Sequence, residues 1–368
     1  MKAITVQDGQ IELVERQMPT PGAGQVLVKS RACGICGSDL HILHHPEEMA
    51  RLAGAMAGAT EEGAPAPAAN AGGAGGAPEI RLGHEYCAEV VAHGPGAEGA
   101  PPVGARVCSI PFLIAPDAGP MGMVGVGLSE GVYGGMSEYF LLQSEFLLPV
   151  PDGLDDAGAA MAEPLAVALH FVTRSEMAPS QVALVVGCGP IGLFTIEALK
   201  LRGVSRIIAS DPHPGRRAIA EALGAASVLD PGVDNVMARA AEAAGETGEA
   251  LAVFECSGAT AVIPPLVAEA PANTRIVVGG VHTTPLTIDP GLAMLKEIDL
   301  RFAFVYSPEE YAEALQALGD GRVAWRRLVT GKVGVDGVAD AFRVLSAPSD
   351  HVKIIVEPWR EGGLEAFA

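Results

Sequence analysis

VALVVGCGPIGLFTIEAL, residues 182–199, passes from a continuous apolar run through a glycine-rich turn into a helical pattern. Gly187, Gly189 and Gly192 give the spacing GxGxxG at the junction. Such glycines permit a tight turn and let a pyrophosphate approach the backbone at the positive end of a helix. The stretch therefore predicts a dinucleotide-binding turn formed by Gly187, Gly189, Pro190, Ile191 and Gly192.

Asp211 ends the next apolar run, RIIASD, where an acidic residue can bind the adenosine ribose of a dinucleotide. Its charge would repel a 2′-phosphate, so we predict NAD rather than NADP as the cofactor. Arg216, which we count among the cofactor-binding residues, and Arg217 follow closely and leave NADP open. The structural alternative is a glycine turn in an α/β sheet that binds no nucleotide.

Strand and helix patterns alternate in the chain around this turn. The apolar runs VALVVG, RIIASD, SVLD, LAVFEC, RIVVGG and LRFAFVY are separated by helical patterns such as RRAIAEALGA. Runs that are apolar on both faces are typical of a buried parallel sheet. We therefore predict an α/β fold with a doubly wound parallel sheet at 156–306, preceded by a β-rich domain of short strands and turns at 1–155.

A low-complexity segment rich in Ala, Gly and Pro lies at 48–78. Its first half, MARLAGAMAG, is compatible with a short helix, and its second half predicts a surface loop. Composition of this kind specifies no packing, so we interpret the segment as a tolerated insertion. A lid over an active site is the alternative.

The charge balance limits the partners of the chain. Its 368 residues include 24 basic and 44 acidic side chains, for a net charge of −20. This argues against a nucleic acid or an anionic membrane surface as partner. The N-terminus lacks the pattern of a signal peptide, and no apolar run is long enough to span a membrane, so we expect a cytoplasmic protein with reduced thiols.

CGICGSDLH, residues 33–41, gathers groups that bind metals and carry protons. It offers the Cys36 thiol, the Ser38 hydroxyl, the Asp39 carboxylate and the His41 imidazole. Because it follows the predicted strand QVLVKSRA, we expect it on a loop that leaves the sheet. We predict that Cys36 binds a catalytic zinc ion and that Ser38 and His41 move a proton from substrate to water.

Other candidate ligands lie far from this stretch in the sequence. His84 and Glu85 head the alternating run CAEVVAH, and Glu163 lies in MAEPLAVALH. Zinc prefers Cys and His, with a carboxylate as an occasional third ligand. No local finger can join Cys36 to His84, so the fold must bring them together, and either glutamate can complete the set. Asp39 is placed to orient the imidazole of His84 as a hydrogen-bond acceptor.

Four motifs occur in order along the chain: CGICGSDLH, GHEYCAEVV, AEPLAVALH and VGCGPIG. Together they closely resemble the zinc-dependent alcohol dehydrogenases of the medium-chain dehydrogenase/reductase family, in the group of sorbitol, threonine and butanediol dehydrogenases. The resemblance covers essentially the whole chain except 48–78. It implies a GroES-like catalytic domain at 1–155, a Rossmann NAD-binding domain at 156–306, a C-terminal return to the catalytic domain at 307–368, and a cleft between the domains.

The resemblance also implies metal ligands. Cys36 rather than Cys33 matches the cysteine ligand of the family, His84 matches the second ligand, and Glu85 matches a carboxylate that lies against the metal. Glu163 falls where many relatives carry a third cysteine and where polyol-type members carry glutamate.

The implied reaction transfers hydride between a secondary alcohol, diol or polyol, or the matching ketone, and NAD. Zinc would lower the pKa of the alcohol hydroxyl. Ser38 would accept the substrate proton and pass it through the nicotinamide ribose to His41.

Two further segments, 103–135 and 300–306, bear on structural zinc and on the oligomeric state. Family members often bind a structural zinc ion through four closely spaced cysteines, but the corresponding region, 103–135, holds only Cys108, so we predict one catalytic zinc ion per chain and no structural zinc. LRFAFVY, residues 300–306, resembles the edge strand through which such subunits pair, so we expect a homodimer or homotetramer.

Three other interpretations remain open. The first is an NADP-dependent alcohol dehydrogenase or carbonyl reductase of the same family. The second is a zinc-free enone or quinone reductase, which would lack CGICGSD and GHE. The third is a non-catalytic protein of the same fold, which would have lost the ligands.

Overall fold

The structure is a computed structural model that describes residues 1–56, 79–118, 122–347 and 349–367. Most of the insertion predicted at 48–78 lies outside these residues, and its described beginning belongs to helix α2 (Pro46–Met56). The chain divides into two compact units: unit 1 comprises Met1–Glu163 and Val329–Ala368, and unit 2 comprises Pro164–Leu328. No helix in the described part of the chain has both the length and the apolar character needed to cross a membrane.

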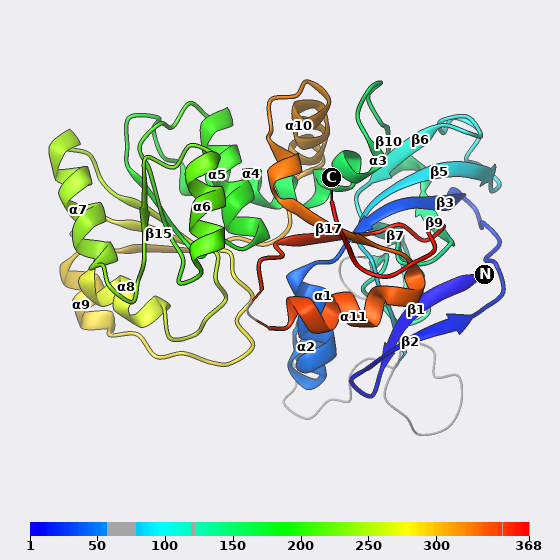
Figure 1. Ribbon diagram of the computed structural model, residues 1–368, viewed down its shortest axis with the longest axis horizontal. Coiled ribbons are helices and arrows are strands. Elements are labelled where there is room, and N and C mark those ends of the chain that lie inside the picture. The colour runs from blue at the N-terminus through cyan, green and yellow to red at the C-terminus, as the bar shows by residue number, and fades with distance from the viewer. Residues whose placement is uncertain (57–78, 119–121, 348, 368) are drawn as a thin grey trace. The chain divides into compact units, whose positions relative to one another are not determined.

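Unit 2 contains a sheet with helices around it (Figure 1). The sheet is parallel and has the strand order β13-β12-β11-β14-β15-β16. This is the order of a doubly wound dinucleotide-binding fold, and it confirms the predicted fold class. The side chains of Ala183–Val185 are fully buried, as the continuous apolar run predicts. The strands are β11 (Ala183–Val186), β12 (Ile207–Ser210), β13 (Ser227–Leu229), β14 (Ala252–Glu255), β15 (Arg275–Val278) and β16 (Asp299–Phe302).

The helices of unit 2 alternate with these strands. They are α4 (Ala162–Ser175, which begins in unit 1), α5 (Pro190–Leu201), α6 (Pro214–Ala222), α7 (Val236–Thr247), α8 (Ile263–Glu269), α9 (Pro290–Leu295), α10 (Pro308–Gly319) and the 3-10 helix η2 (Trp325–Arg327).

The compact units change at 163/164 and 328/329, whereas the division expected from the sequence lies at 155/156 and 306/307. Residues 307–328, which we expected in the C-terminal return, therefore belong to unit 2. Two side-chain contacts explain this: Glu310 is 2.9 Å from His170 Nδ1 on α4, and Glu313 accepts a 2.8 Å hydrogen bond from Arg202. Both contacts hold α10 to unit 2.

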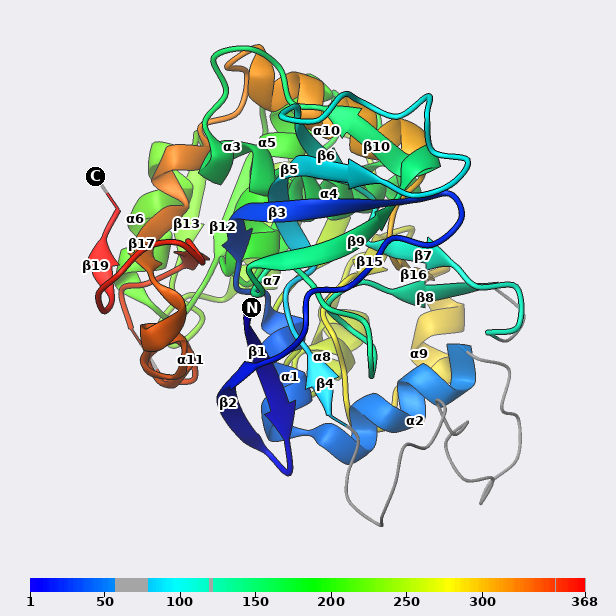
Figure 2. The same ribbon diagram turned by 90° about the vertical axis from the view of Figure 1, so that its right-hand side faces the viewer.

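Unit 1 is rich in strands (Figure 2). In its described residues, one sheet has the order β10-β6-β5-β3-β18-β17-β19 with β9 also paired to β3, a second has the order β2-β1-β4, and a hairpin joins β7 to β8. The strands are β1 (Lys2–Gln7), β2 (Gln10–Glu15), β3 (Gln25–Gly34), β4 (Ile80–Arg81), β5 (Glu85–His93), β6 (Arg106–Ser109), β7 (Phe112–Ile114), β8 (Met123–Gly125), β9 (Tyr139–Gln143), β10 (Leu147–Pro149), β17 (Val329–Val333), β18 (Lys353–Val356) and β19 (Glu365–Ala366).

Few helices accompany the strands of unit 1. They are α1 (Gly37–His44), α2, α3 (Asp156–Ala160), α11 (Val338–Leu345) and the 3-10 helices η1 (Ser144–Phe146) and η3 (Val335–Gly337). The expectation that residues after the first long strand form a loop is wrong for 37–44, which form α1. Asp39 explains the helix start, because its carboxylate accepts a 2.9 Å hydrogen bond from the Cys36 backbone N–H in a capping box.

The pairing of three strands positions the functional residues. In the antiparallel register of β3 and β5, Gly34 lies opposite Glu85, so the residues after β3 and those before β5 meet at one end of the pair. A Cβ atom on Gly34 would lie 2.0 Å from the Glu85 carboxylate, which explains the glycine there. β18 pairs antiparallel to β3 and places the C-terminal segment beside the same end.

Candidate metal centre and nucleotide turn

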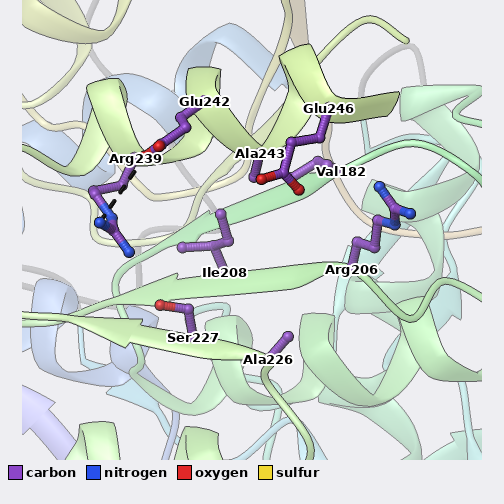
Figure 3. A pocket seen from close by; sticks show the side chains of 9 residues that line it. All are labelled: Val182, Arg206, Ile208, Ala226, Ser227, Arg239, Glu242, Ala243 and Glu246. Atoms are coloured by element: carbon purple, nitrogen blue, oxygen red, sulfur yellow. Dashed lines mark ion pairs between the residues drawn. The ribbon is translucent and has the colours of Figure 1, made fainter. Parts of the chain in front are cut away.

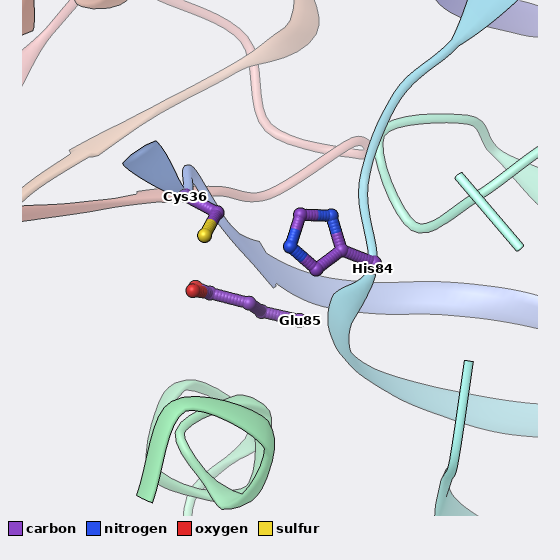
Figure 4. A group of neighbouring side chains, drawn as sticks. All are labelled: Cys36, His84 and Glu85. Carbon is purple, nitrogen blue, oxygen red and sulfur yellow. The ribbon is translucent and has the colours of Figure 1, made fainter. Parts of the chain in front are cut away.

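Cys36, His84 and Glu85 converge in unit 1 (Figure 4). The ligand atoms of the thiol, the imidazole and the carboxylate lie within 4.8 Å of one another. Among the residues that the structure describes, this is the one group of three or more such side chains close enough to hold a metal ion. Cys36 lies two residues after the end of β3 and His84 directly precedes β5, so the strand register brings together residues that are distant in sequence.

Asp39 and Ser38 hold the imidazole of His84 from two sides. Ser38 Oγ lies 3.2 Å from His84 Nε2, and Asp39 Oδ1 lies 3.5 Å from His84 Nδ1. Burial alone would lower the pKa of His84, but Asp39 and Cys36 outweigh this and hold that pKa well above its ordinary value. The surroundings of the imidazole therefore favour positive charge at this point.

Lys353 neutralises Glu85 inside the protein. Its ammonium lies 2.7 Å from each carboxylate oxygen of Glu85 and donates a third hydrogen bond, of 2.9 Å, to the carbonyl oxygen of Ile35. Burial alone would lower the pKa of Lys353, but the Glu85 charge and the Cys36 sulfur beside it raise that pKa above its ordinary value. The pair is therefore ionic, and all three ammonium protons are used.

The donor set fits a divalent zinc ion. Sulfur, imidazole nitrogen and carboxylate oxygen are the atoms that zinc prefers. With Cys36 as a thiolate and His84 neutral, as metal binding requires, the centre holds three anionic side chains, Cys36, Asp39 and Glu85, against the one ammonium of Lys353. Buried charge of one sign is unfavourable unless it is paired, so a divalent cation would balance this centre.

The structure does not gather every predicted residue at this centre. Glu163 is buried at the start of α4, but its carboxylate is not part of the group that Cys36, His84 and Glu85 form. His41 lies on α1, half-buried, with its ring 5.8 Å from that of His45.

Lys353 contacts the candidate metal centre through Glu85, and the sequence interpretation missed it. The available signal was a lysine inside the apolar run HVKIIVEP, where a charged side chain needs a buried partner.

The glycine turn of unit 2 lies between β11 and α5. Gly189 precedes the helix, and Pro190 opens it. A Cβ atom on Gly192 would lie 1.8 Å from the carbonyl oxygen of Gly187, so the turn requires glycine there, whereas a Cβ atom on Gly189 would meet nothing within 4 Å. The backbone is thus closely packed at Gly192 and open at Gly189. Open backbone at the N-terminus of α5 is where a pyrophosphate can bind.

Asp211 and the two arginines after it differ in their contacts. Asp211 is buried and accepts hydrogen bonds of 2.7 Å from the Cys188 backbone N–H and 2.8 Å from that of His213. Arg217 donates to the carbonyl oxygen of Asp211 and lies 3.1 Å from Asp230. Arg216 has a buried Nε atom with no hydrogen-bond partner among the described residues.

A cavity of about 340 Å³ lies at the amino ends of strands of the same sheet, opposite the end that carries the glycine turn (Figure 3). Arg206 and Ser227, at the amino ends of β12 and β13, and Arg239 and Glu242 of α7 line it. It contains none of the residues predicted to bind the cofactor, because the glycine turn follows the carboxyl end of β11.

Two family descriptions match the chain. Residues 22–152 match the alcohol dehydrogenase GroES-like domain, and residues 190–320 match the zinc-binding dehydrogenases. (R,R)-butanediol dehydrogenase of Bacillus subtilis (strain 168) is 32% identical over 363 residues, covering 96% of this chain and 97% of that relative.

Solved structures agree with these matches. The structure of 2R,3R-butanediol dehydrogenase from Bacillus subtilis superposes with a TM-score of 0.79 and 30% identity over 97% of this chain and 99% of that one. A protein from Sinorhizobium meliloti 1021, solved bound to NADP, gives a TM-score of 0.79 and 26% identity over 97% and 99%. This chain belongs to the zinc-type alcohol dehydrogenases of the medium-chain dehydrogenase/reductase family, which are oxidoreductases acting on CH–OH groups.

Proposed function

We propose that the protein oxidises one secondary alcohol of a vicinal diol or polyol, or reduces the matching ketone, with NAD and one catalytic zinc ion per chain. The convergence of Cys36, His84 and Glu85 beside a buried lysine is the observation that carries this proposal. The likeness to butanediol dehydrogenase over nearly the whole chain supports a diol as substrate.

Cys36, His84 and Glu85 would hold the metal, with Asp39 orienting His84 and Lys353 orienting Glu85. Lys353 does so through hydrogen bonds, and Asp39 through the proximity of its carboxylate, 3.5 Å from His84 Nδ1; such partners fix the direction of ligand side chains. Bound there, zinc would supply the Lewis acidity that lowers the pKa of a substrate hydroxyl. Glu163 is the alternative carboxylate ligand, but the geometry favours Glu85 because only its oxygen lies with the thiol and the imidazole.

Ser38 and His41 would carry the substrate proton. Ser38 Oγ contacts His84 Nε2, so its hydroxyl lies beside the donor set, within reach of a substrate oxygen held there. His41 lies on the same helix. Histidine is the side chain whose ordinary pKa suits proton exchange with water near neutral pH. Ser38 would accept the substrate proton and His41 would give it to water, and the cofactor, when bound, would supply a hydroxyl able to relay it.

Gly187, Gly189, Pro190, Ile191 and Gly192 would bind the pyrophosphate of NAD, and Asp211 the adenosine ribose. A buried carboxylate in this position disfavours a 2′-phosphate. One observation favours NADP: the Nε atom of Arg216 has no hydrogen-bond partner among the described residues, so its guanidinium could bind a 2′-phosphate. We prefer NAD because the Asp211 carboxylate directly follows β12, where it would repel a 2′-phosphate on the adenosine ribose.

We also propose that the subunits pair through β16. This strand lies at the edge of the unit 2 sheet, and Phe302 and Phe304 are 67% and 68% exposed. An unpaired strand edge with exposed aromatic side chains favours association with a second copy. A homodimer, or a homotetramer built from dimers, follows.

The proposed activity is tested by NADH formation with butane-2,3-diol, sorbitol, threonine and primary alcohols, with Cys36→Ser as the control. We expect turnover of a secondary alcohol or diol by the wild type and none by the variant. Turnover of an enone or quinone with NADPH that survives Cys36→Ser would support the zinc-free reductase instead.

A further inference from the structure

Three loops of unit 2 meet at the buried carboxylate of Glu255. Glu255 is the last residue of β14, lies beside Val186 of β11 and Val278 of β15, and is fully buried. Its Oε1 atom accepts hydrogen bonds from the Ser257 backbone N–H, 2.8 Å, and the Ser257 hydroxyl, 2.5 Å. The Gly258 N–H donates a third, 3.0 Å.

The other carboxylate oxygen holds a histidine. Glu255 Oε2 lies 2.9 Å from His282 Nε2, in the segment that follows β15. An ionised carboxylate only accepts hydrogen bonds, so Nε2 donates to Glu255, and in the neutral form of the imidazole Nδ1 is then an acceptor. Nδ1 is buried, and it has no hydrogen-bond partner in the part of the chain that the structure describes.

The glycine turn packs against the same loops. A Cβ atom on Gly187 would lie 2.9 Å from Ser257 Cα, and one on Gly280 would lie 2.7 Å from Glu255 Oε2. The segments after β11, β14 and β15 are therefore in direct contact, and Glu255 bonds two of them. His282 is 12% exposed, so its position is set by this packing as well as by the carboxylate.

The topology indicates what lies over this group of residues. Strand order reverses between β11 and β14, and a dinucleotide binds across the carboxyl ends of the strands at that point. The adenosine half belongs on the side of Asp211 and β12, with the pyrophosphate at the turn after β11. The nicotinamide half must then lie toward β14 and β15, where Glu255 and His282 are.

We propose that His282, held by Glu255, is a positioning residue for the nicotinamide half of the cofactor. Its Nδ1 atom accepts a hydrogen bond from an N–H or O–H of that half, either the carboxamide or the ribose. A buried acceptor left without a donor is unfavourable, and the bound cofactor supplies the donor. This inference rests on the proposed function, because it assumes that the turn binds a dinucleotide.

Two substitutions separate the two nitrogens of the ring. In His282→Gln the side-chain amide reaches the position of Nε2, keeping a donor to Glu255 and losing the group at Nδ1. In His282→Asn the amide occupies the position of Nδ1 and loses the link to Glu255. Comparison of the two distinguishes a contact with the cofactor from a purely structural role.

The test is titration of the full zinc-loaded chain with NADH and with AMP, followed by fluorescence or calorimetry. We expect His282→Gln to weaken NADH binding roughly fivefold to tenfold, the value of one hydrogen bond, and AMP binding to change less than about twofold. His282→Asn should retain more NADH affinity than His282→Gln. The 3-acetylpyridine analogue of the cofactor, which lacks the carboxamide N–H, should bind equally to wild type and His282→Gln if the carboxamide is the donor, and unequally if the ribose is.

NADH affinity unchanged in His282→Gln would overturn the inference, as would an equal loss of NADH and AMP affinity, which indicates a structural role. A wild-type chain that binds neither NADH nor AMP would overturn the proposed function together with this inference. A loss of affinity for NADH but not for AMP in His282→Gln would support the inference on His282, and AMP binding by the same variant shows that the dinucleotide turn itself is intact.

Discussion

The ammonium of Lys353 lies 2.7 Å from both carboxylate oxygens of Glu85, and the two side chains are 1% and 0% exposed. β18 carries the lysine and β5 the glutamate, with β3 between them. The pair joins the C-terminal segment of the chain to the candidate metal centre.

Lys353→Met should destabilise unit 1 strongly, because it leaves the Glu85 carboxylate buried without a counter-charge. Removing one partner of a buried pair costs about 3–5 kcal/mol in free energy of unfolding. Urea denaturation of the metal-free protein measures this cost. The matched control is Lys2→Met, whose exposed ion pair with Asp336 should contribute less than about 1 kcal/mol. Equal effects of the two substitutions would contradict an ionic Lys353–Glu85 pair.

His41→Gln should slow alcohol oxidation most below about pH 7, with NADH affinity little changed. Bases in solution are scarce at low pH, so the loss of a histidine that exchanges the substrate proton is felt most there. The measurement is the pH profile of kcat, with and without added imidazole, which should restore part of the rate. A profile identical to that of the wild type would remove His41 from the proton path.

Asp211→Asn should improve the use of NADP relative to NAD by about tenfold or more, because it removes the charge that repels a 2′-phosphate. The asparagine keeps an acceptor oxygen for the Cys188 or His213 backbone N–H. Adding Arg216→Met should cancel the gain if Arg216 binds the phosphate. The ratio of kcat/KM for the two cofactors measures both effects, and an unchanged ratio in Asp211→Asn would contradict the assigned role of Asp211.

Phe302→Ser combined with Phe304→Ser should reduce the assembly size seen in sedimentation, since both rings are exposed, Phe302 at the end of the edge strand β16 and Phe304 two residues after it. Val233→Ser, another exposed apolar residue, 84% exposed, serves as control and should change nothing. A wild-type protein that sediments as a monomer would contradict the proposed pairing.

The glycine turn could be predicted from the sequence because its signal is local: apolar strand, GxGxxG and helix are contiguous in residues 182–199. The parallel sheet followed from runs apolar on both faces. Helix α1 was missed because two glycines and several polar side chains in CGICGSDLH favour a loop, and the helix depends on the cap that Asp39 supplies.

The contacts at the metal centre depend on strand register, which the sequence does not reveal. Cys36 and His84 meet because Gly34 pairs with Glu85 in one particular alignment of β3 and β5. Lys353 arrives through β18, near the other end of the chain, so no spacing rule connects it to Glu85. The resemblance implied the cysteine, the histidine and the two glutamates as ligands, and of the two glutamates Glu85 lies in the group that Cys36 and His84 form.

The zinc content of the purified chain, measured after dialysis against a weak chelator, tests the central claim most directly. We predict one zinc ion per chain for the wild type and for Glu163→Gln, and substantially less than one for Cys36→Ser and Glu85→Gln. A wild type that binds no zinc, or a Cys36→Ser variant that keeps a full equivalent, would contradict a metal centre at Cys36, His84 and Glu85.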